Sequence, residues 1–116
     1  MYQEFILFLG TDKLEETDHF YRNVLQLDLY KDQKKCRIYK INDHSSIGFC
    51  THIKITAEEK SPIITLVTDD VDAIYKRLKD QGINLLHEPQ VNEQFNIYHF
   101  FFKDNNGYTI EIQKFL

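Results

Sequence analysis

The sequence predicts an α+β fold in which two βαβββ modules, paired in one domain, form a curved mixed sheet. Three observations indicate this class. Apolar residues alternate between the period of strands and the period of helices, in the same order twice along the chain. The halves also repeat, because ILFLGTD (6–12) aligns with IITLVTD (63–69) and DHFYRNVL (18–25) aligns with DAIYKRLK (72–79). Finally, 116 residues of which 42% are apolar suffice for one domain of 1–116 but not for two separate ones.

The first module is expected to span about residues 1–55. Short apolar or alternating stretches predict its strands, and apolar residues at helical spacing predict its helix. In chain order we expect a strand over 4–10, a helix over 14–25, and strands over 27–32, 35–41 and 45–55.

A polar connector at 56–61 leads into the second module, which is expected to span about residues 62–116. The same patterns predict its elements, and the residues between its last two strands predict a hairpin turn, because Asn and Gly accept positive φ angles. In chain order we expect a strand over 63–70, a helix from Val71 that stops at Gly82, and strands over 83–89, 95–103 and 108–115.

Charge and composition exclude several function classes. The 14 basic and 18 acidic residues give a net charge of −4 with no basic run beyond Lys34–Lys35, so nucleic acid is not an expected partner. No apolar run approaches the roughly 18 residues of a membrane span, and no signal-type segment is present. We therefore expect a cytoplasmic protein without a membrane partner. In a reducing compartment Cys36 and Cys50 are expected to be buried free thiols rather than a disulfide.

Three segments carry a family resemblance, namely FYRNVLQL (20–27), VTDDVDAIYKRLKDQGI (67–83) and FFFKDNNGYTIEIQ (100–113). They resemble the vicinal oxygen chelate superfamily, which includes glyoxalase I, extradiol dioxygenases, fosfomycin-modifying enzymes and bleomycin-binding resistance proteins. The resemblance covers nearly the whole chain and implies paired βαβββ modules and a homodimer. Because members share a scaffold and differ in chemistry, it does not imply one activity.

Glu111 is the residue to which this resemblance gives the clearest role. In the metal-dependent members the final strand carries a glutamate ligand at this position. The other ligand positions fall on side chains that cannot coordinate a metal, namely Phe5 or Ile6, Gly48 and Ile63. Because a transition metal needs three or more convergent donors, we predict neither the ordinary metal site nor a cofactor.

One other metal site stays open at this point. The curved sheet is expected to form a trough on the face that the helices leave uncovered. Gly48, Cys50 and His52 alternate onto one face of the predicted strand 45–55, and the repeat directs that face toward this trough, as it does Glu111. A Cys50–His52–Glu111 cluster is therefore an alternative to a buried Cys50 with His52 near solvent.

The hairpin turn sets which side chains share a face with Glu111. If the turn holds four residues, Lys103 pairs with Tyr108, and Phe100 therefore pairs with Glu111. This register points His99 to the opposite, helix-covered face, so we predict that it is no partner for Glu111.

The same register surrounds the carboxylate with aromatic rings. Aromatic side chains with a few polar groups in a concavity are typical of small-molecule sites, although the rings could instead fill the trough or a subunit seam. The predicted ligand-binding residues are Tyr98, Phe100, Phe102, Glu111, Cys50 and His52.

Two function classes follow from these residues. The first is a metal-independent protein that binds a small planar or amphiphilic molecule, as the bleomycin-type resistance and sequestration proteins do. The second is a divergent glyoxalase-like lyase or thiol transferase in which Glu111 is the catalytic general base. The missing metal ligands favour the first class. A domain that chiefly binds a partner protein is a third possibility.

Overall fold

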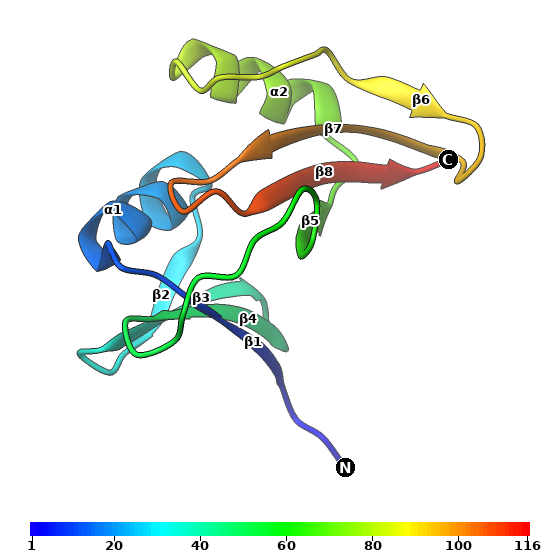
Figure 1. Ribbon diagram of the computed structural model, residues 1–116. Helices are drawn as coiled ribbons and strands as arrows, with labels where there is room; N and C mark the ends of the chain where they lie inside the picture. Colours follow the sequence, from blue (N-terminus) through cyan, green and yellow to red (C-terminus); the bar gives the residue numbers. More distant parts are fainter. The chain divides into compact units, whose positions relative to one another are not determined.

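The computed structural model describes residues 1–116 as two compact units, Met1–Thr56 and Ala57–Leu116. Figure 1 shows each unit in the colours of the sequence, the first in blue to green and the second in green to red. Each unit has the element order βαβββ and one four-stranded sheet with parallel and antiparallel pairs. The predicted α+β class and the repeated element order are therefore confirmed.

The first unit places its first strand beside its last. Its sheet has the order β1-β4-β3-β2, in which β1 is parallel to β4 and the other neighbours are antiparallel. Its elements are β1 (Phe5–Gly10), α1 (Leu14–His19), the π-helical η1 (Phe20–Val24), β2 (Asp28–Asp32), β3 (Cys36–Asn42) and β4 (Ser45–Cys50).

The helix of the first unit widens half-way along. The predicted helix over 14–25 begins as α1, and its second half is η1, where the Leu25 amide donates to the Phe20 carbonyl at 2.9 Å. This segment carries the buried Tyr21 ring, which lies 4.4 Å from the Phe49 ring of β4 between centroids. The helix therefore covers one face of the sheet through aromatic contacts.

Tyr39 of β3 is fully buried on this helix-covered face. Its hydroxyl donates to Asp18 Oδ1 at 2.8 Å, and Arg37 lies 3.7 Å from the same carboxylate oxygen. Burial, followed by the hydrogen bond to Asp18, raises the pKa of Tyr39 well above its ordinary value.

We expect Tyr39 to make the protein sensitive to alkali. Its raised pKa means that the folded chain holds the phenol proton more tightly than the unfolded chain does. That stability is complete below the unfolded pKa of 10.0 and is lost as pH rises through the folded pKa. The free energy of unfolding, measured with urea at a series of pH values, should fall above pH 10.0. The free energy of unfolding of Tyr39→Phe should fall less steeply with pH, whereas that of Tyr2→Phe, which changes an exposed ring, should fall as in the wild type.

Strand β4 is shorter than the sequence predicts. The predicted strand over 45–55 ends at Cys50, so that prediction was wrong for its last five residues. The chain turns there, because the Ile53 amide donates back to the Cys50 carbonyl at 3.4 Å and the Thr51 amide to the Lys35 carbonyl at 2.8 Å. His52 therefore does not continue the alternation of Gly48 and Cys50.

The prediction of free thiols was also wrong. Cys36 and Cys50 form a disulfide between β3 and β4, where they face each other in the strand register with Cα atoms 4.1 Å apart. No cysteine remains unpaired. The expectation rested on the compartment rather than on the register of the two strands.

The second unit repeats this topology. Its sheet has the order β5-β8-β7-β6, in which β5 is parallel to β8. Its elements are β5 (Ile63–Val67), α2 (Val71–Asp80), β6 (Gln90–Asn92), β7 (Ile97–Lys103) and β8 (Thr109–Phe115).

The predicted strand over 83–89 was wrong. These residues form no strand, and the second strand of the module is the short β6 that follows them. Gln90 pairs with His99, and the preceding Pro89 has no N–H to donate to a strand ladder. The apolar residues before it therefore lie outside the sheet.

The hairpin between β7 and β8 holds five residues, 104–108, rather than four. Asp104 and Tyr108 belong to the turn, because the Asp104 amide donates to the Tyr108 carbonyl at 3.0 Å and Asp104 Oδ1 accepts from the Tyr108 amide at 2.8 Å. Lys103 consequently pairs with Thr109, and Phe101 pairs with Glu111. The predicted register was wrong by one residue, which exchanges the faces of every side chain in β7 relative to β8.

This shift puts the three predicted pocket aromatics on the face away from Glu111. Phe100 and Phe102 are buried, and the Phe100 ring lies 5.2 Å edge-on from the Tyr75 ring of α2. The hydroxyl of Tyr98 donates to Asp72, also on α2. Phe100 and Phe102 therefore form core under the helix, and the half-buried Tyr98 contacts the same helix, instead of lining a trough with Glu111.

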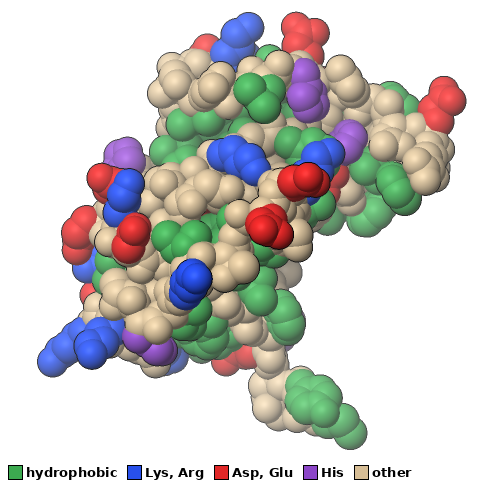
Figure 2. Space-filling model, in the orientation of Figure 1, with side chains coloured by type: hydrophobic (Ala, Val, Ile, Leu, Met, Phe, Trp, Pro, Cys, Tyr) green, Lys and Arg blue, Asp and Glu red, His purple; other side chains and the backbone are tan.

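Charges of both signs are scattered over the surface. Figure 2 shows Lys and Arg side chains interspersed with Asp and Glu on the face in view, without a region of one sign. Neither helix is long and apolar enough to cross a membrane.

Candidate functional site: an acid and a histidine in a pocket of the second unit

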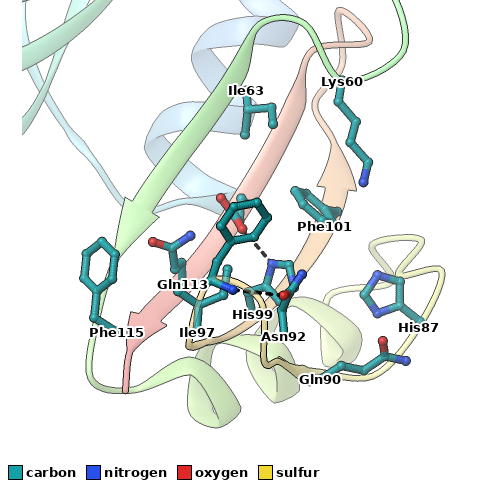
Figure 3. A pocket seen from close by; sticks show the side chains of 12 residues that line it. Lys60, Ile63, His87, Gln90, Asn92, Ile97, His99, Phe101, Gln113 and Phe115 are labelled. Carbon is teal, nitrogen blue, oxygen red and sulfur yellow. Dashed lines mark hydrogen bonds and ion pairs between the residues drawn. The ribbon is translucent and has the colours of Figure 1, made fainter.

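The open face of the second sheet carries a pocket with a volume of about 680 Å³. All four strands of the unit and the segments on either side of β6 contribute to its wall (Figure 3). The lining residues are Lys60, Ile63, His87, Gln90, Asn92, Phe95, Ile97, His99, Phe101, Glu111, Gln113 and Phe115. A volume of this size suits a small organic molecule.

Glu111 lies at the floor of this pocket and is 6% exposed. Two neighbouring strands present partners to it. From β5, the Thr65 hydroxyl donates to Oε1 at 2.7 Å, and from β7, His99 Nδ1 lies 2.6 Å from Oε2. Because each carboxylate oxygen has a hydrogen-bond partner, these contacts offset the cost of burying the carboxylate.

The contact with Glu111 defines what His99 can do. An ionised carboxylate only accepts hydrogen bonds, so Nδ1 carries the proton and Nε2 of a neutral ring is an acceptor. The hydrogen bond of the His99 ring to the protein is the one at Nδ1, which leaves Nε2 for a bound molecule. Glu111 thus holds the ring in one tautomer and one orientation.

Aromatic and amide side chains surround this pair. The Phe101 ring meets His99 edge-on with centroids 5.0 Å apart, and Lys60 Nζ lies 4.3 Å from the centre of the Phe101 ring. Asn92 Oδ1 accepts from the Phe95 amide at 3.2 Å, which holds the loop that presents the Phe95 ring. The pocket therefore combines flat apolar walls with one buried, oriented imidazole.

The first unit has no such pair at the equivalent place. Gly48 pairs with Phe8 and Ile38 in the register in which Glu111 pairs with Thr65 and Phe101. The Phe8 ring lies over Gly48, where a Cβ atom would come within 2.6 Å of its Cε1. An aromatic ring thus occupies the space that polar side chains use in the second unit.

The model of one protein family matches residues 6–112, nearly the whole chain. It is the Glyoxalase/Bleomycin resistance protein/Dioxygenase superfamily. The chain belongs to this superfamily. The resemblance drawn from the sequence is therefore confirmed.

Several solved structures share the fold. A glyoxalase/bleomycin resistance protein/dioxygenase from Nocardioides superposes with a TM-score of 0.76 at 21% identity, over 96% of this chain and 82% of that one. Lactoylglutathione lyase from Agrobacterium tumefaciens superposes with a TM-score of 0.77 at 17% identity, over 95% of this chain and 91% of that one. An integron cassette protein of V. Cholerae superposes with a TM-score of 0.76 at 18% identity, over 100% of this chain and 96% of that one. No curated protein matches the chain. At these identities the likeness establishes the fold alone.

The donor set around Glu111 does not fit the metal ion that some superfamily members carry. Glu111 and His99 are two candidate ligands, but no third His, Cys, Asp or Glu side chain lies close enough to complete a set of three, and Ile63 lines the same pocket without a donor atom. The one group of three His, Cys, Asp or Glu side chains close enough to hold an ion lies in the first unit. We therefore derive no step through a metal at Glu111.

The structure separates the predicted site residues. Glu111 lines the pocket, whereas Tyr98, Phe100 and Phe102 lie on the opposite face of the sheet. Cys50 and His52 lie in the first unit with Cys36, and Glu111 is not part of that group. The sequence did not predict three aromatic residues of the pocket, Phe95, Phe101 and Phe115. It also did not predict the two hydrogen-bond partners of Glu111, Thr65 and His99.

Proposed function

We propose that this superfamily member is a metal-independent protein that binds a small planar or amphiphilic molecule in the pocket of its second unit. The observation that carries the proposal is the Glu111–His99 pair, which directs an acceptor nitrogen into an aromatic-walled pocket. Resistance proteins that sequester small molecules provide the model for this function.

The chemistry of the pocket narrows the ligand. Both oxygens of Glu111 already accept hydrogen bonds, so a ligand meets His99 Nε2 before it meets the carboxylate. Nε2 of the neutral ring needs a donor, such as a phenol or an N–H group. The rings of Phe95, Phe101 and Phe115 offer flat surfaces to the apolar body of that molecule.

A lyase or isomerase of the glyoxalase kind is the second candidate, and the same pair of residues favours it. A carboxylate that fixes the tautomer of a histidine prepares the other ring nitrogen to take a proton from a substrate. In this reading His99 is the general base and Glu111 orients it, which reverses the role that sequence analysis gives to Glu111.

We expect catechol, which has a planar body and two hydroxyl donors, to stabilise the wild-type protein against heat. A ligand at 100 times its dissociation constant stabilises by about 2.7 kcal/mol. Catechol should lose at least about tenfold in affinity for His99→Ala and Glu111→Gln, because the first removes the acceptor and the second its orientation. Differential scanning fluorimetry over a catechol titration measures both effects.

The matched controls change one group each. Veratrole keeps the ring but replaces both hydroxyls with methyl ethers, so it should bind more weakly to the wild type. His19→Ala removes a histidine of α1 and should bind catechol as the wild type does. Equal affinity of the wild type, His99→Ala and Glu111→Gln for catechol, or equal affinity of the wild type for catechol and veratrole, would contradict the proposed role of His99.

The two candidate functions separate in one further measurement. Methylglyoxal and a thiol form a hemithioacetal whose carbon-bound proton exchanges with deuterium when a general base abstracts it. If the protein only binds the molecule, the exchange rate recorded by proton NMR should be the same with the protein as in buffer alone. Exchange that needs His99 would establish the enzyme instead.

A further inference from the structure

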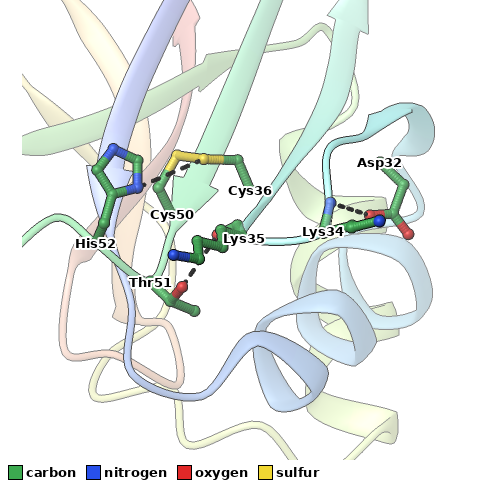
Figure 4. Close-up of a disulfide and its surroundings, with 7 residues drawn as sticks. All are labelled: Asp32, Lys34, Lys35, Cys36, Cys50, Thr51 and His52. Carbon is green, nitrogen blue, oxygen red and sulfur yellow. Dashed lines mark hydrogen bonds between the residues drawn. A yellow bond between two sulfur atoms is a disulfide. The ribbon is translucent and has the colours of Figure 1, made fainter.

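We propose that the reduced form of the protein binds a thiophilic metal ion, such as Zn²⁺, through Cys36, Cys50 and His52 of the first unit. Their sulfur and nitrogen atoms all lie within 4.8 Å of one another. Figure 4 shows the His52 ring turned toward the two sulfur atoms. This site is independent of the pocket around Glu111.

Strand pairing brings the two cysteines together. Cys36 begins β3 and Cys50 ends β4, and they are partners in the antiparallel register with Cα atoms 4.1 Å apart. The Cys36 carbonyl accepts from the Gln33 amide at 2.8 Å, and the Cys50 carbonyl accepts from the Thr11 amide at 3.1 Å. Because the backbone holds both residues, their sulfur atoms stay neighbours whether or not they are bonded.

A tight turn adds the histidine. After Cys50 the chain folds back, so that His52 Nδ1 lies 3.9 Å from Cys36 Sγ. The turn passes directly over Gly10, where a Cβ atom would overlap the carbonyl oxygen of Ile53. A glycine at the end of β1 therefore permits the approach that places His52 above the sulfur atoms.

The separations suit tetrahedral coordination. With Zn–S near 2.3 Å and Zn–N near 2.0 Å, tetrahedral angles place sulfur and nitrogen about 3.5 Å apart and two sulfurs about 3.8 Å apart. His52 Nδ1 and Cys36 Sγ are at 3.9 Å, close to the first value. Once the disulfide is reduced, rotation of the cysteine side chains about χ1 separates the sulfurs toward the second value.

Reduction is the step that creates the ligands. A dithiol reductant transfers two electrons to the Cys36–Cys50 bond, which breaks while the two sulfurs take up two protons and the reductant becomes a disulfide. A metal ion then displaces those two protons from the thiols and accepts His52 Nδ1 as a third ligand. The disulfide form cannot offer thiolates, so metal binding and oxidation exclude each other.

The ligand types select the class of ion. Two thiolates and an imidazole favour Zn²⁺ or Cu⁺ over Mg²⁺ or Ca²⁺, which prefer oxygen donors. Both cysteines are buried, whereas His52 is exposed and marks the side from which an ion and a fourth ligand, such as water, can enter.

The test is a titration of the reduced protein with Cd²⁺, used as a spectroscopic stand-in for Zn²⁺. The wild type, reduced with a dithiol and freed of it under argon, should bind one ion per chain and develop a thiolate-to-cadmium absorption band in the ultraviolet. Added Zn²⁺ should remove that band. The oxidised wild type, which has the same fold and no free thiol, should neither bind Cd²⁺ at this site nor develop the band.

Substitutions assign the ligands. His52→Ala should keep the thiolate band but weaken Cd²⁺ binding by about 100-fold or more. Loss of a residue that only contacts a metal ligand lowers metal affinity by about 10–100-fold, and loss of a ligand itself should cost at least as much. His44→Ala, which removes an exposed histidine before β4, and His99→Ala in the second unit should bind as the wild type does. Reduced protein alkylated with iodoacetamide should not bind, which tests the thiols without relying on a cysteine variant.

Three results would overturn the proposal. They are equal binding by oxidised and reduced protein, absence of the thiolate band from the reduced wild type, and equal weakening in His52→Ala and His44→Ala. Each would place any bound ion away from the three proposed ligands.

Discussion

Phe100→Ala is expected to lower the free energy of unfolding by about 3–5 kcal/mol, the usual cost of removing a fully buried aromatic ring. Phe100 is 0% exposed and packs against Tyr75 of α2 and Phe102 of its own strand. Truncation leaves a cavity under the helix that these neighbours cannot fill. Urea unfolding at equilibrium, followed by circular dichroism, measures the loss.

The adjacent residue provides the control. Phe101 lies on the other face, lines the pocket and contacts His99 and Lys60. Phe101→Ala should cost only about 1 kcal/mol of stability, because a partly solvated ring buries less apolar area, and it should weaken catechol binding. The reverse pattern, with Phe100→Ala stable but unable to bind, would support a four-residue turn and contradict the register described above.

Reduction of the Cys36–Cys50 disulfide is expected to lower the free energy of unfolding by about 3 kcal/mol, the value for a closed loop of about 15 residues. The two cysteines are separated by 14 positions. The cross-link restricts the unfolded chain, so its loss stabilises the unfolded state. Thermal melts of the oxidised and the reduced protein should differ by about 10 °C.

The disulfide prediction needs a measurement without metal, because an ion bound by the reduced thiols would restore part of the lost stability. Melts in the presence of a chelator therefore give the full difference in melting temperature between the oxidised and the reduced protein. Added Zn²⁺ should raise the melting temperature of the reduced protein and so make this difference smaller. Identical melts of oxidised and reduced protein in chelator would show that the cross-link does not constrain the unfolded chain.

The element order could be predicted because the periodicity is strong and appears twice. Strands such as β1 and β5, and the helix α2, lie within one to three residues of their predicted positions. The residues 83–89 misled the prediction, since a short stretch that contains several apolar residues resembles a strand, whereas the strand pairing begins only at Gln90. A short apolar stretch indicates a possible buried surface, whereas a strand also needs a partner for its backbone groups.

The site could be predicted only in part, because its composition depends on the length of one turn. Glu111 was found, but His99 was assigned to the wrong face. A signal was present in the sequence. Ile110 and Ile112 form the apolar face of β8, and pairing them with Phe100 as core residues would have placed His99 beside Glu111. Matching the apolar faces of two strands is therefore a better guide to register than counting turn residues.

The pairing of Cys36 with Cys50 shows a different limit. Composition and compartment bear on the oxidation state of a thiol, but only strand register shows that two thiols are neighbours. The same holds for His52, whose approach depends on the turn after β4 and on the absence of a side chain at Gly10.

The Phe8 ring over Gly48 distinguishes the two halves of the internal repeat. The first half has a phenyl ring at the middle of its sheet, whereas the second has a carboxylate and an imidazole at the corresponding point. Each polypeptide is therefore expected to saturate with a single catechol equivalent, despite its internal symmetry. The first half carries a different chemistry, at the sulfur atoms of β3 and β4.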